Sequence, residues 1–288
     1  MTQEAKNPYP VWSEELRFAI HCAKEAGNLV KERASVIPTL SWKSRTDFKT
    51  QVDDECDTLI RCMIGEKYPH DTIYSEENLA KVGTSRRSWV VDPLDGTIPF
   101  AYQINNHSSI CIALTEKDTQ GLGVIYAMFR EELYVAELGK GAFLNDIPIH
   151  VSDDAILNKA LVAIDFGKID RLRPISHLIS LLQPDGANAV FSSLCASVNL
   201  AYVASGRIHM YLAGELEPWD MAAAVVILRE AGGKVTNLEG EEWRLKHSSI
   251  LTANPHLHKI ALQRFDTEEM QKVLQALLQK IQREYYTK

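Results

Sequence analysis

The sequence predicts a mixed α+β fold, arranged either as one large domain or as two subdomains that share a cleft. Three observations predict it: helical apolar spacing near the N-terminus, β-like composition after Asp71, and strands that alternate with helices in the second half. The 288 residues, 45% of them hydrophobic, are sufficient for a sizeable buried core.

Two helices are expected before the strands begin. Ser13 is a plausible N-cap for a helix that ends near Ala34, because apolar residues recur along one face of that segment. A second helix is expected over Asp54–Tyr68. The short polar segment Leu40–Val52 between them is predicted to be a connector or a hairpin.

The middle of the chain is predicted to form a series of strands. Its segments are rich in β-branched and aromatic residues and are separated by turns, including a hairpin turn at Arg130–Glu132. A further strand is expected after Asp146. The other expected strands are Thr72–Ser75, Ser88–Val91, Ser108–Leu114, Gly123–Phe129 and Leu133–Glu137.

The second half is predicted to alternate strands and helices. Gly232 and Gly233 form a favourable helix stop, and Asp266 with Glu269 gives a capping-box pattern for a last helix. That helix is expected to pack on the body or on a partner subunit. The expected strands are Leu161–Ile164, His209–Leu212 and Lys234–Asn237, and the expected helices are Pro174–Leu182, Ala196–Ser205, Met221–Ala231 and Asp266–Tyr286.

The composition excludes some functions. A net charge of −7 argues against binding to a nucleic-acid polymer and is compatible with a bound cation. No apolar run approaches the roughly 18 residues of a membrane-spanning helix, and the first residues lack the apolar core of a signal peptide. Five cysteines without C-x-x-C spacing indicate reduced thiols and a cytoplasmic location. His247, His256 and His258 are expected at the surface.

The most informative stretch is Trp89–Thr97, in which an apolar strand leads directly into Asp92 and Asp95. Two carboxylates at one strand end cannot both be ionised without a compensating charge, and a hard divalent cation such as Mg²⁺ supplies it. Gly96 lets the backbone approach a ligand, and free N–H groups at Thr97 would face an anion. Taken alone, an Asx-type turn explains the segment equally well.

Two further acidic positions follow the same pattern. Glu76 and Glu77 come directly after an expected strand, where a solvated surface pair is the simpler interpretation. Asp220 precedes an apolar helix, where helix capping is the simpler interpretation. The coincidence of all three acidic segments favours a shared metal site.

Together these segments resemble the inositol monophosphatase family. This family belongs to the superfamily of magnesium-dependent, lithium-sensitive phosphatases. The resemblance rests on the motifs Asp92–Thr97, Trp219-Asp220-x-Ala-x-Ala and Glu230–Gly233, and it spans roughly Ser13 to Arg264. It implies a layered αβαβα sandwich of the inositol monophosphatase or fructose-1,6-bisphosphatase type. Residues 1–151 would form an N-terminal α+β subdomain with most metal ligands. Residues 152–288 would form a C-terminal α/β subdomain that completes the active site and carries the extra C-terminal helix.

The resemblance also implies a set of site residues. Two or three Mg²⁺ ions would be held by several acids and one carbonyl, with Glu77 near a weaker third site. The Asp47 carboxylate would pair with the Thr97 hydroxyl to orient the attacking water, with Thr50 supporting the segment and Glu76 also catalytic. The metal ligands would be Glu76, Asp92, the Leu94 carbonyl, Asp95 and Asp220, and the phosphate would lie on Asp95 and the N–H groups of Gly96 and Thr97.

The substrate side departs from the inositol-specific pattern. Ala213 replaces an acidic residue that contacts sugar hydroxyls, Cys195 replaces a threonine, and Pro99 alters the loop beyond the phosphate. By position, Asp220, Ser197 and the loop around Asp165 to Lys168 are the expected substrate contacts. Lys168 could bind a second phosphate, although a solvated surface charge is the simpler interpretation.

The resulting prediction is a phosphoric monoester hydrolase that acts on a small inositol or sugar phosphate, with no membrane or nucleic-acid partner and with homodimers expected. One alternative is a bisphosphate phosphatase that acts on 3′-phosphoadenosine nucleotides or fructose 1,6-bisphosphate. The other is a non-catalytic relative that binds metal or a partner protein.

Overall fold

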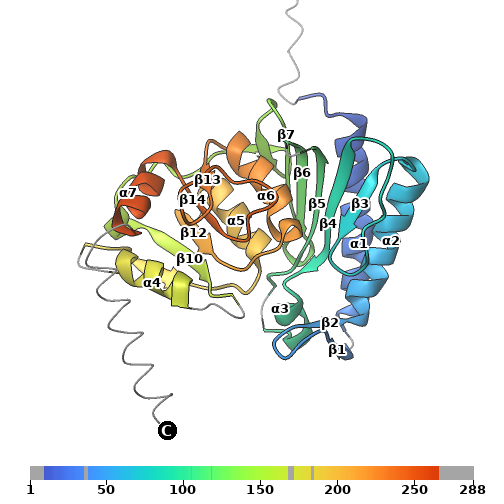
Figure 1. The fold of residues 1–288 in the computed structure, drawn as a ribbon, viewed down its shortest axis with the longest axis horizontal. Coiled ribbons are helices and arrows are strands. Elements are labelled where there is room, and N and C mark those ends of the chain that lie inside the picture. The colour runs from blue at the N-terminus through green and yellow to red at the C-terminus, as the bar shows by residue number, and fades with distance from the viewer. Residues whose placement is uncertain are drawn as a thin grey trace, which may run out of the picture.

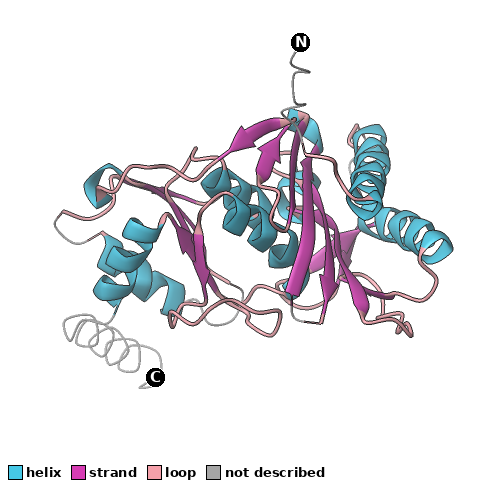
Figure 2. Ribbon diagram, turned by 90° about the horizontal axis from the view of Figure 1, so that it is seen from above, coloured by secondary structure: helices cyan, strands magenta, loops and turns pink. Residues whose placement is uncertain are grey.

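The protein has the layered αβαβα arrangement that was expected (Figure 1). The computed structural model describes residues 10–35, 38–104, 106–117, 119–167, 172–182 and 185–265. One sheet lies between an outer pair of helices and an inner pair, and a second sheet follows on the other side of the inner pair (Figure 2). The helices in this order of layers are the outer pair α1 (Glu14–Arg33) and α2 (Gln51–Lys67), the inner pair α5 (Ala196–Ala204) and α6 (Pro218–Glu230), and the far pair α4 (Leu172–Leu181) and α7 (Pro255–Phe265).

The first sheet has seven strands in the order β3-β4-β5-β6-β7-β8-β9. Only the β3–β4 pair is parallel, and the others form an antiparallel meander. The expected hairpin turn between β6 and β7 is confirmed, and Glu131 adopts a positive φ there. The strands are β3 (Thr72–Ser75), β4 (Arg87–Asp95), β5 (Ser109–Glu116), β6 (Thr119–Ala127), β7 (Glu132–Glu137), β8 (Ala142–Leu144) and β9 (Ile147–Ile149).

The second sheet has five strands in the order β11-β10-β12-β14-β13. Strand β10 is parallel to both of its neighbours, so the C-terminal ends of β10 and β12 lie at the same edge. The strands are β10 (Leu161–Asp165), β11 (Ala189–Phe191), β12 (Met210–Ala213), β13 (Lys234–Thr236) and β14 (Ile250–Ala253). The division into subdomains near residue 151 stays a prediction.

The segment before α2 forms the hairpin that was one of two expectations. Strands β1 (Leu40–Trp42) and β2 (Phe48–Thr50) pair in antiparallel register. Helix α2 begins at Gln51, three residues earlier than expected, because Thr50 caps it and forms a capping box with Asp53.

Several short elements were not expected. They are β8, β11, β14, α7, the six-residue helix α3 (Thr97–Tyr102) and two 3₁₀ turns, at Met128–Arg130 and Leu157–Lys159. The helix expected over Asp266–Tyr286 lies outside the described residues. Among the described residues, no helix combines the length and apolar character that crossing a bilayer requires.

Helix α6 is the centre of the molecule because it lies between the two sheets. Its residues from Met221 to Leu228 are all buried. It approaches β6 so closely that a Cβ on Gly123 would lie 2.2 Å from the Ala223 carbonyl oxygen. This contact fixes the height of α6 above the first sheet.

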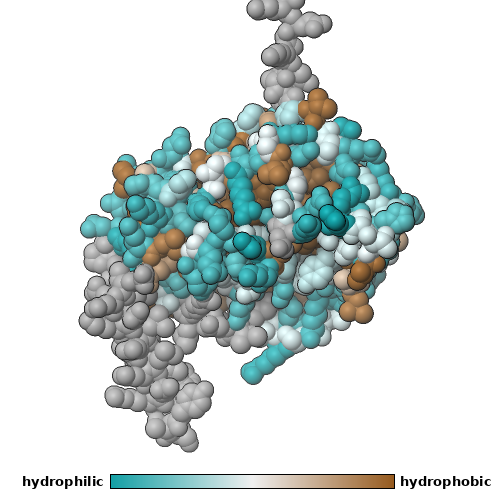
Figure 3. Space-filling model, turned by 45° about the horizontal axis from the view of Figure 1, so that its top comes forward, coloured by the Kyte–Doolittle hydropathy of each residue, from teal (hydrophilic) through white to brown (hydrophobic). Residues whose placement is uncertain are grey.

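The face of the molecule shown in Figure 3 is mostly hydrophilic, with scattered hydrophobic residues.

The expectation that His258 is a surface residue is wrong. The side chain is 3% exposed, and its Nε2 lies 2.9 Å from the Thr236 hydroxyl, because α7 packs against the second sheet. Burial and the nearby Lys234 charge lower the pKa of His258 to about 4. Four of the five cysteines are buried, and Cys62 is exposed.

We predict that this histidine makes the fold sensitive to mild acid. The folded protein holds the pKa of His258 at about 4, below the usual value of 6.5, so between these pH values only the unfolded chain binds the proton. Stability should therefore fall as the pH is lowered from 6.5 to 4, by up to about 3 kcal/mol from this residue. Urea unfolding at pH 7 and pH 4.5 should show a smaller acid loss for His258→Gln than for the exposed control His256→Gln. Equal acid losses would contradict the assignment.

Candidate metal centre

Strand β4 delivers two aspartates to the edge of the first sheet. The register with β5 shifts between Asp92 and Asp95, and this irregularity lets both side chains leave the same strand end. Asp92 is buried and its Oδ1 accepts the Leu94 N–H at 3.0 Å, so the Asx-type turn is also present. Gly96 follows with φ 81°, and a Cβ there would lie 2.4 Å from the His107 carbonyl oxygen. Only glycine fits this position.

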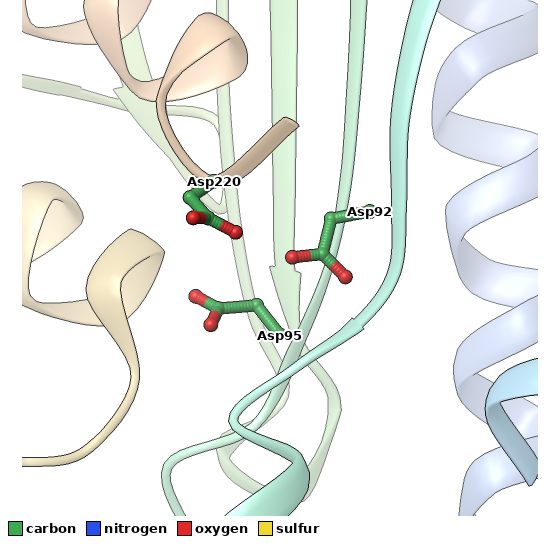
Figure 4. A group of neighbouring side chains, drawn as sticks. All are labelled: Asp92, Asp95 and Asp220. Carbon is green, nitrogen blue, oxygen red and sulfur yellow. The ribbon is translucent and has the colours of Figure 1, made fainter. Parts of the chain in front are cut away.

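Helix α6 brings the third aspartate from a distant part of the chain. Asp220 lies in the first turn, where its Oδ2 accepts the Glu217 N–H at 2.8 Å. The capping function and the metal-site function are therefore compatible. Asp92, Asp95 and Asp220 can each present a carboxylate oxygen so that all three atoms lie within 4.8 Å of one another (Figure 4).

The electrostatics of this cluster call for a positive charge. Burial raises the pKa of Asp92 and Asp220 well above the usual value, and their acidic neighbours raise both further. Burial also raises the pKa of Asp95, while hydrogen bonds from Ser197 and Cys195 oppose that rise. The cluster is made of hard oxygen donors, and a divalent cation would relieve their repulsion without protonating them. The residues present therefore fit Mg²⁺.

Glu76 and Glu77 lie beside the cluster with lysine partners. Lys43, from the β1–β2 turn, places Nζ 2.9 Å from an oxygen of Glu76 and 2.6 Å from an oxygen of Glu77. Lys49 lies 3.4 Å from the other oxygen of Glu77. The negative charge of Glu76 raises the pKa of both Asp92 and Asp220, so it belongs to the same electrostatic field. Sequence reasoning missed these lysines, which now carry part of the compensating charge.

The Thr97 hydroxyl has a different carboxylate partner from the one expected. Its oxygen lies 3.0 Å from Oδ1 of Asp53 and 3.1 Å from the Leu94 carbonyl oxygen. The expected pairing with Asp47 is thus replaced by pairing with Asp53, six residues later. The Asp47 charge instead raises the pKa of Glu76, and its backbone carbonyl closes the β1–β2 turn.

Asp53 is suited to this position because α2 holds it. Its Oδ2 accepts the Thr50 N–H at 2.8 Å and the Thr50 hydroxyl at 2.5 Å, so Thr50 supports the segment as expected. Asp53 is 1% exposed, and burial raises its pKa to about 6. The spacing Thr-x-x-Asp is a capping-box pattern, and this signal would have identified Asp53 from the sequence.

Ser197 supports a carboxylate rather than facing an open cleft. It is fully buried, and both its N–H (2.7 Å) and its hydroxyl donate to Oδ2 of Asp95. Cys195, in the position of the family's threonine, lies 3.2 Å from the same oxygen. The expected substrate contact Lys168 lies outside the described residues.

Comparison with known proteins identifies the family. Residues 12–281 match the model of the inositol monophosphatase family. The chain is 31% identical over 258 residues to the inositol-1-monophosphatase of Bacillus subtilis (strain 168), covering 88% of this chain and 97% of that protein. It is 34% identical over 251 residues to a protein of Pasteurella multocida (strain Pm70) named Nus factor SuhB, covering 85% and 92%.

Solved structures agree with the sequence comparison. The crystal structure of the extragenic suppressor protein suhB from Bartonella henselae superposes with a TM-score of 0.84 at 28% identity, covering 89% of this chain and 100% of that one. The chain therefore belongs to the inositol monophosphatase family.

Proposed function

We propose that the protein is a magnesium-dependent phosphatase that hydrolyses a small phosphate monoester. The observation that carries the proposal is the convergence of Asp92, Asp95 and Asp220 next to the Asp53–Thr97 pair. The three carboxylates form a site for divalent cations. The Thr97 hydroxyl, held by Asp53, can orient a water molecule. Metal-assisted phosphate hydrolysis needs both parts.

Two or three Mg²⁺ ions would be held by Asp92, Asp95, Asp220, Glu76 and the Leu94 carbonyl, with Glu77 near the weakest position. When bound, magnesium supplies positive charge that stabilises the transferred phosphoryl group and the oxygen that leaves. Lys43 lies between the two glutamates and would share their charge with an ion at that position.

The chain itself orients the nucleophile. Asp53 and the Leu94 carbonyl both accept from the Thr97 hydroxyl, so the hydrogen of Thr97 points toward them. The lone pairs of the Thr97 oxygen are then available to accept a hydrogen from the attacking water. Thr50 fixes Asp53 and thereby fixes the direction of this hydrogen bond.

The start of α3 suits the phosphate. Gly96 is the N-cap of α3, and the first N–H groups of a helix have no partner within the helix. The N–H groups of Gly96 and Thr97 would therefore donate to phosphoryl oxygens, next to the Asp95 carboxylate. This arrangement needs the left-handed Gly96, whose position excludes any side chain.

A non-catalytic role is the second candidate, because one relative is named a Nus factor. The hydrogen bond between Thr97 and the buried Asp53 favours catalysis, since metal or partner binding alone has no use for a positioned hydroxyl. A bisphosphate substrate is the third candidate, and it depends on cationic residues such as Lys168. Homodimerisation remains a prediction from the resemblance, and a cytoplasmic location remains a prediction from the cysteines.

The first test removes one charge from the cluster. Asp95→Asn should lower turnover of p-nitrophenyl phosphate with magnesium by at least about 100-fold, because a lost ligand weakens transition-state charge stabilisation by several kcal/mol. The thermal unfolding of Asp95→Asn should stay close to wild type. The activity of the exposed control Asp153→Asn should also stay close to wild type. Near-normal turnover by Asp95→Asn would refute its role. Absence of magnesium-dependent turnover in the wild type would refute the proposed function.

The second test asks which aspartate serves Thr97. Thr97→Ala and Asp53→Asn should each lower kcat by about 100-fold, and the double variant should be little worse, because both remove one water-orienting unit. Asp47→Asn should change kcat much less. Magnesium affinity by calorimetry should stay within a few-fold throughout. A larger loss for Asp47→Asn than for Asp53→Asn would restore the original pairing.

A further inference from the structure

A fourth aspartate, Asp165, lies at the end of β10 and belongs to no part of the proposed reaction. Its carboxylate is held by donors from three different elements. Oδ1 accepts the Ser192 hydroxyl at 2.7 Å, and Oδ2 accepts the Tyr211 hydroxyl at 2.7 Å and the Asn199 amide at 3.3 Å. Tyr211 and Asn199 are fully buried, whereas Asp165 is partly exposed. The carboxylate is therefore held by three hydrogen bonds and is still partly exposed.

The first turn of α5 connects this carboxylate to the metal cluster. Ser197 donates to Asp95, and Asn199, two residues later, donates to Asp165. The two carboxylates are close enough for the charge of Asp165 to raise the pKa of Asp95. Asp165 therefore lies on the wall next to the phosphate site, where the alcohol part of a bound monoester would lie.

The neighbouring strand carries a small residue at this point. Asp165 pairs in parallel register with Ala213, the last residue of β12, so their side chains are neighbours at the same sheet edge. Ala213 is small and lacks a polar group, so Asp165 is the residue of this pair that can bind a hydroxyl.

The adjacent loop adds a second carboxylate. Glu215, which has φ 56°, places Oε2 2.6 Å from the position that a Cβ on Gly167 would occupy. The side chain of Glu215 therefore lies against the loop after β10. The described part of this wall is acidic, and it would repel a second phosphate while accepting hydrogen bonds from neutral donors.

We propose that Asp165 helps to select the substrate by accepting a hydrogen bond from a hydroxyl on the alcohol part of the monoester. The inference rests on the proposed phosphatase function. An ionised carboxylate only accepts hydrogen bonds and has about four acceptor positions. Ser192, Tyr211 and Asn199 use three of them. A remaining acceptor position can take a hydrogen bond from a substrate hydroxyl, because Asp165 is partly exposed.

The preorganisation of Asp165 gives this contact its discriminating power. Burial raises the pKa of Tyr211 well above the usual value, so its hydroxyl remains a donor. A carboxylate that is already oriented loses little entropy when a hydroxyl binds. A substrate without a hydroxyl at that position leaves the acceptor unsatisfied and binds less tightly.

The test compares two substrates that differ in their alcohol part. We expect Asp165→Asn and Asp165→Ala to lower kcat/KM for myo-inositol 1-phosphate by about 10- to 100-fold, mainly through KM. For p-nitrophenyl phosphate, whose leaving group has no second hydroxyl, kcat/KM should change less than about 3-fold. The exposed Asp153→Asn serves as the matched control and should leave both substrates unaffected.

Equal losses for both substrates would overturn the inference, because they would show a structural or metal-site role. No loss for either substrate would also overturn it. Two variants are used so that misfolding of one, detected by thermal unfolding, does not decide the result.

A binding arm separates the two proposals. Calorimetry with magnesium and myo-inositol 1-phosphate on Thr97→Ala, and on Thr97→Ala with Asp165→Asn, measures recognition while turnover is strongly reduced. An affinity about 10-fold weaker in the double variant supports the role of Asp165 even if the wild type hydrolyses nothing, which would refute only the proposed function. Equal affinity, or no binding by Thr97→Ala, overturns the role of Asp165.

Discussion

The mutual repulsion of Asp92, Asp95 and Asp220 is the constraint on which the rest of the structure depends. The oxygens of these three carboxylates can lie within 4.8 Å of one another. Burial raises the pKa of Asp92 and Asp220 most, and the charges of neighbouring acids raise it further. Such a cluster is stable only with protons, a cation or strong donors nearby. Ser197 and Lys43 supply part of that compensation to the surrounding acids, and a divalent ion would supply the rest.

The packing of α6 against the first sheet holds these three acids together. Asp92 and Asp95 come from the first sheet, and Asp220 comes from a helix between the sheets, so any movement of α6 would separate them. Gly123 allows α6 to lie close to β6, because a side chain at residue 123 would displace the helix. Burial of the α6 residues from Met221 to Leu228 restrains the helix in this position. A functional geometry is thus maintained by residues that do not touch the site.

The features that the sequence predicted well are those encoded locally. The N-cap at Ser13 and the apolar strand that ends in Asp92 depend only on neighbouring residues, and the structure confirms both. Strand β11 was missed because it has three residues and a weak burial pattern. Helix α7 was missed although Pro255 at its first position is a typical helix start.

Features that depend on contacts between distant residues could not be predicted in the same way. The pairing of Thr97 with Asp53 spans 44 residues, and the segment offered Asp47 as an equally plausible partner. The decision depends on the capping box at Thr50, which turns Asp53 inward. Lys43 was invisible for a similar reason, since only the β1–β2 hairpin brings it between Glu76 and Glu77.

The same reasoning explains why the substrate side is harder to infer than the metal side. Metal ligands recur in short motifs because the ion requires particular atoms, whereas a hydroxyl of the alcohol can be bound from any nearby backbone position. Parallel pairing makes Asp165 of β10 and Ala213 of β12 neighbours at one sheet edge. Tyr211, which also lies on β12, is 46 residues from Asp165 in the sequence. A carboxylate absent from β12 can therefore be supplied by β10. In the proposed site, substrate choice would follow from the residues that share this sheet edge rather than from a single position.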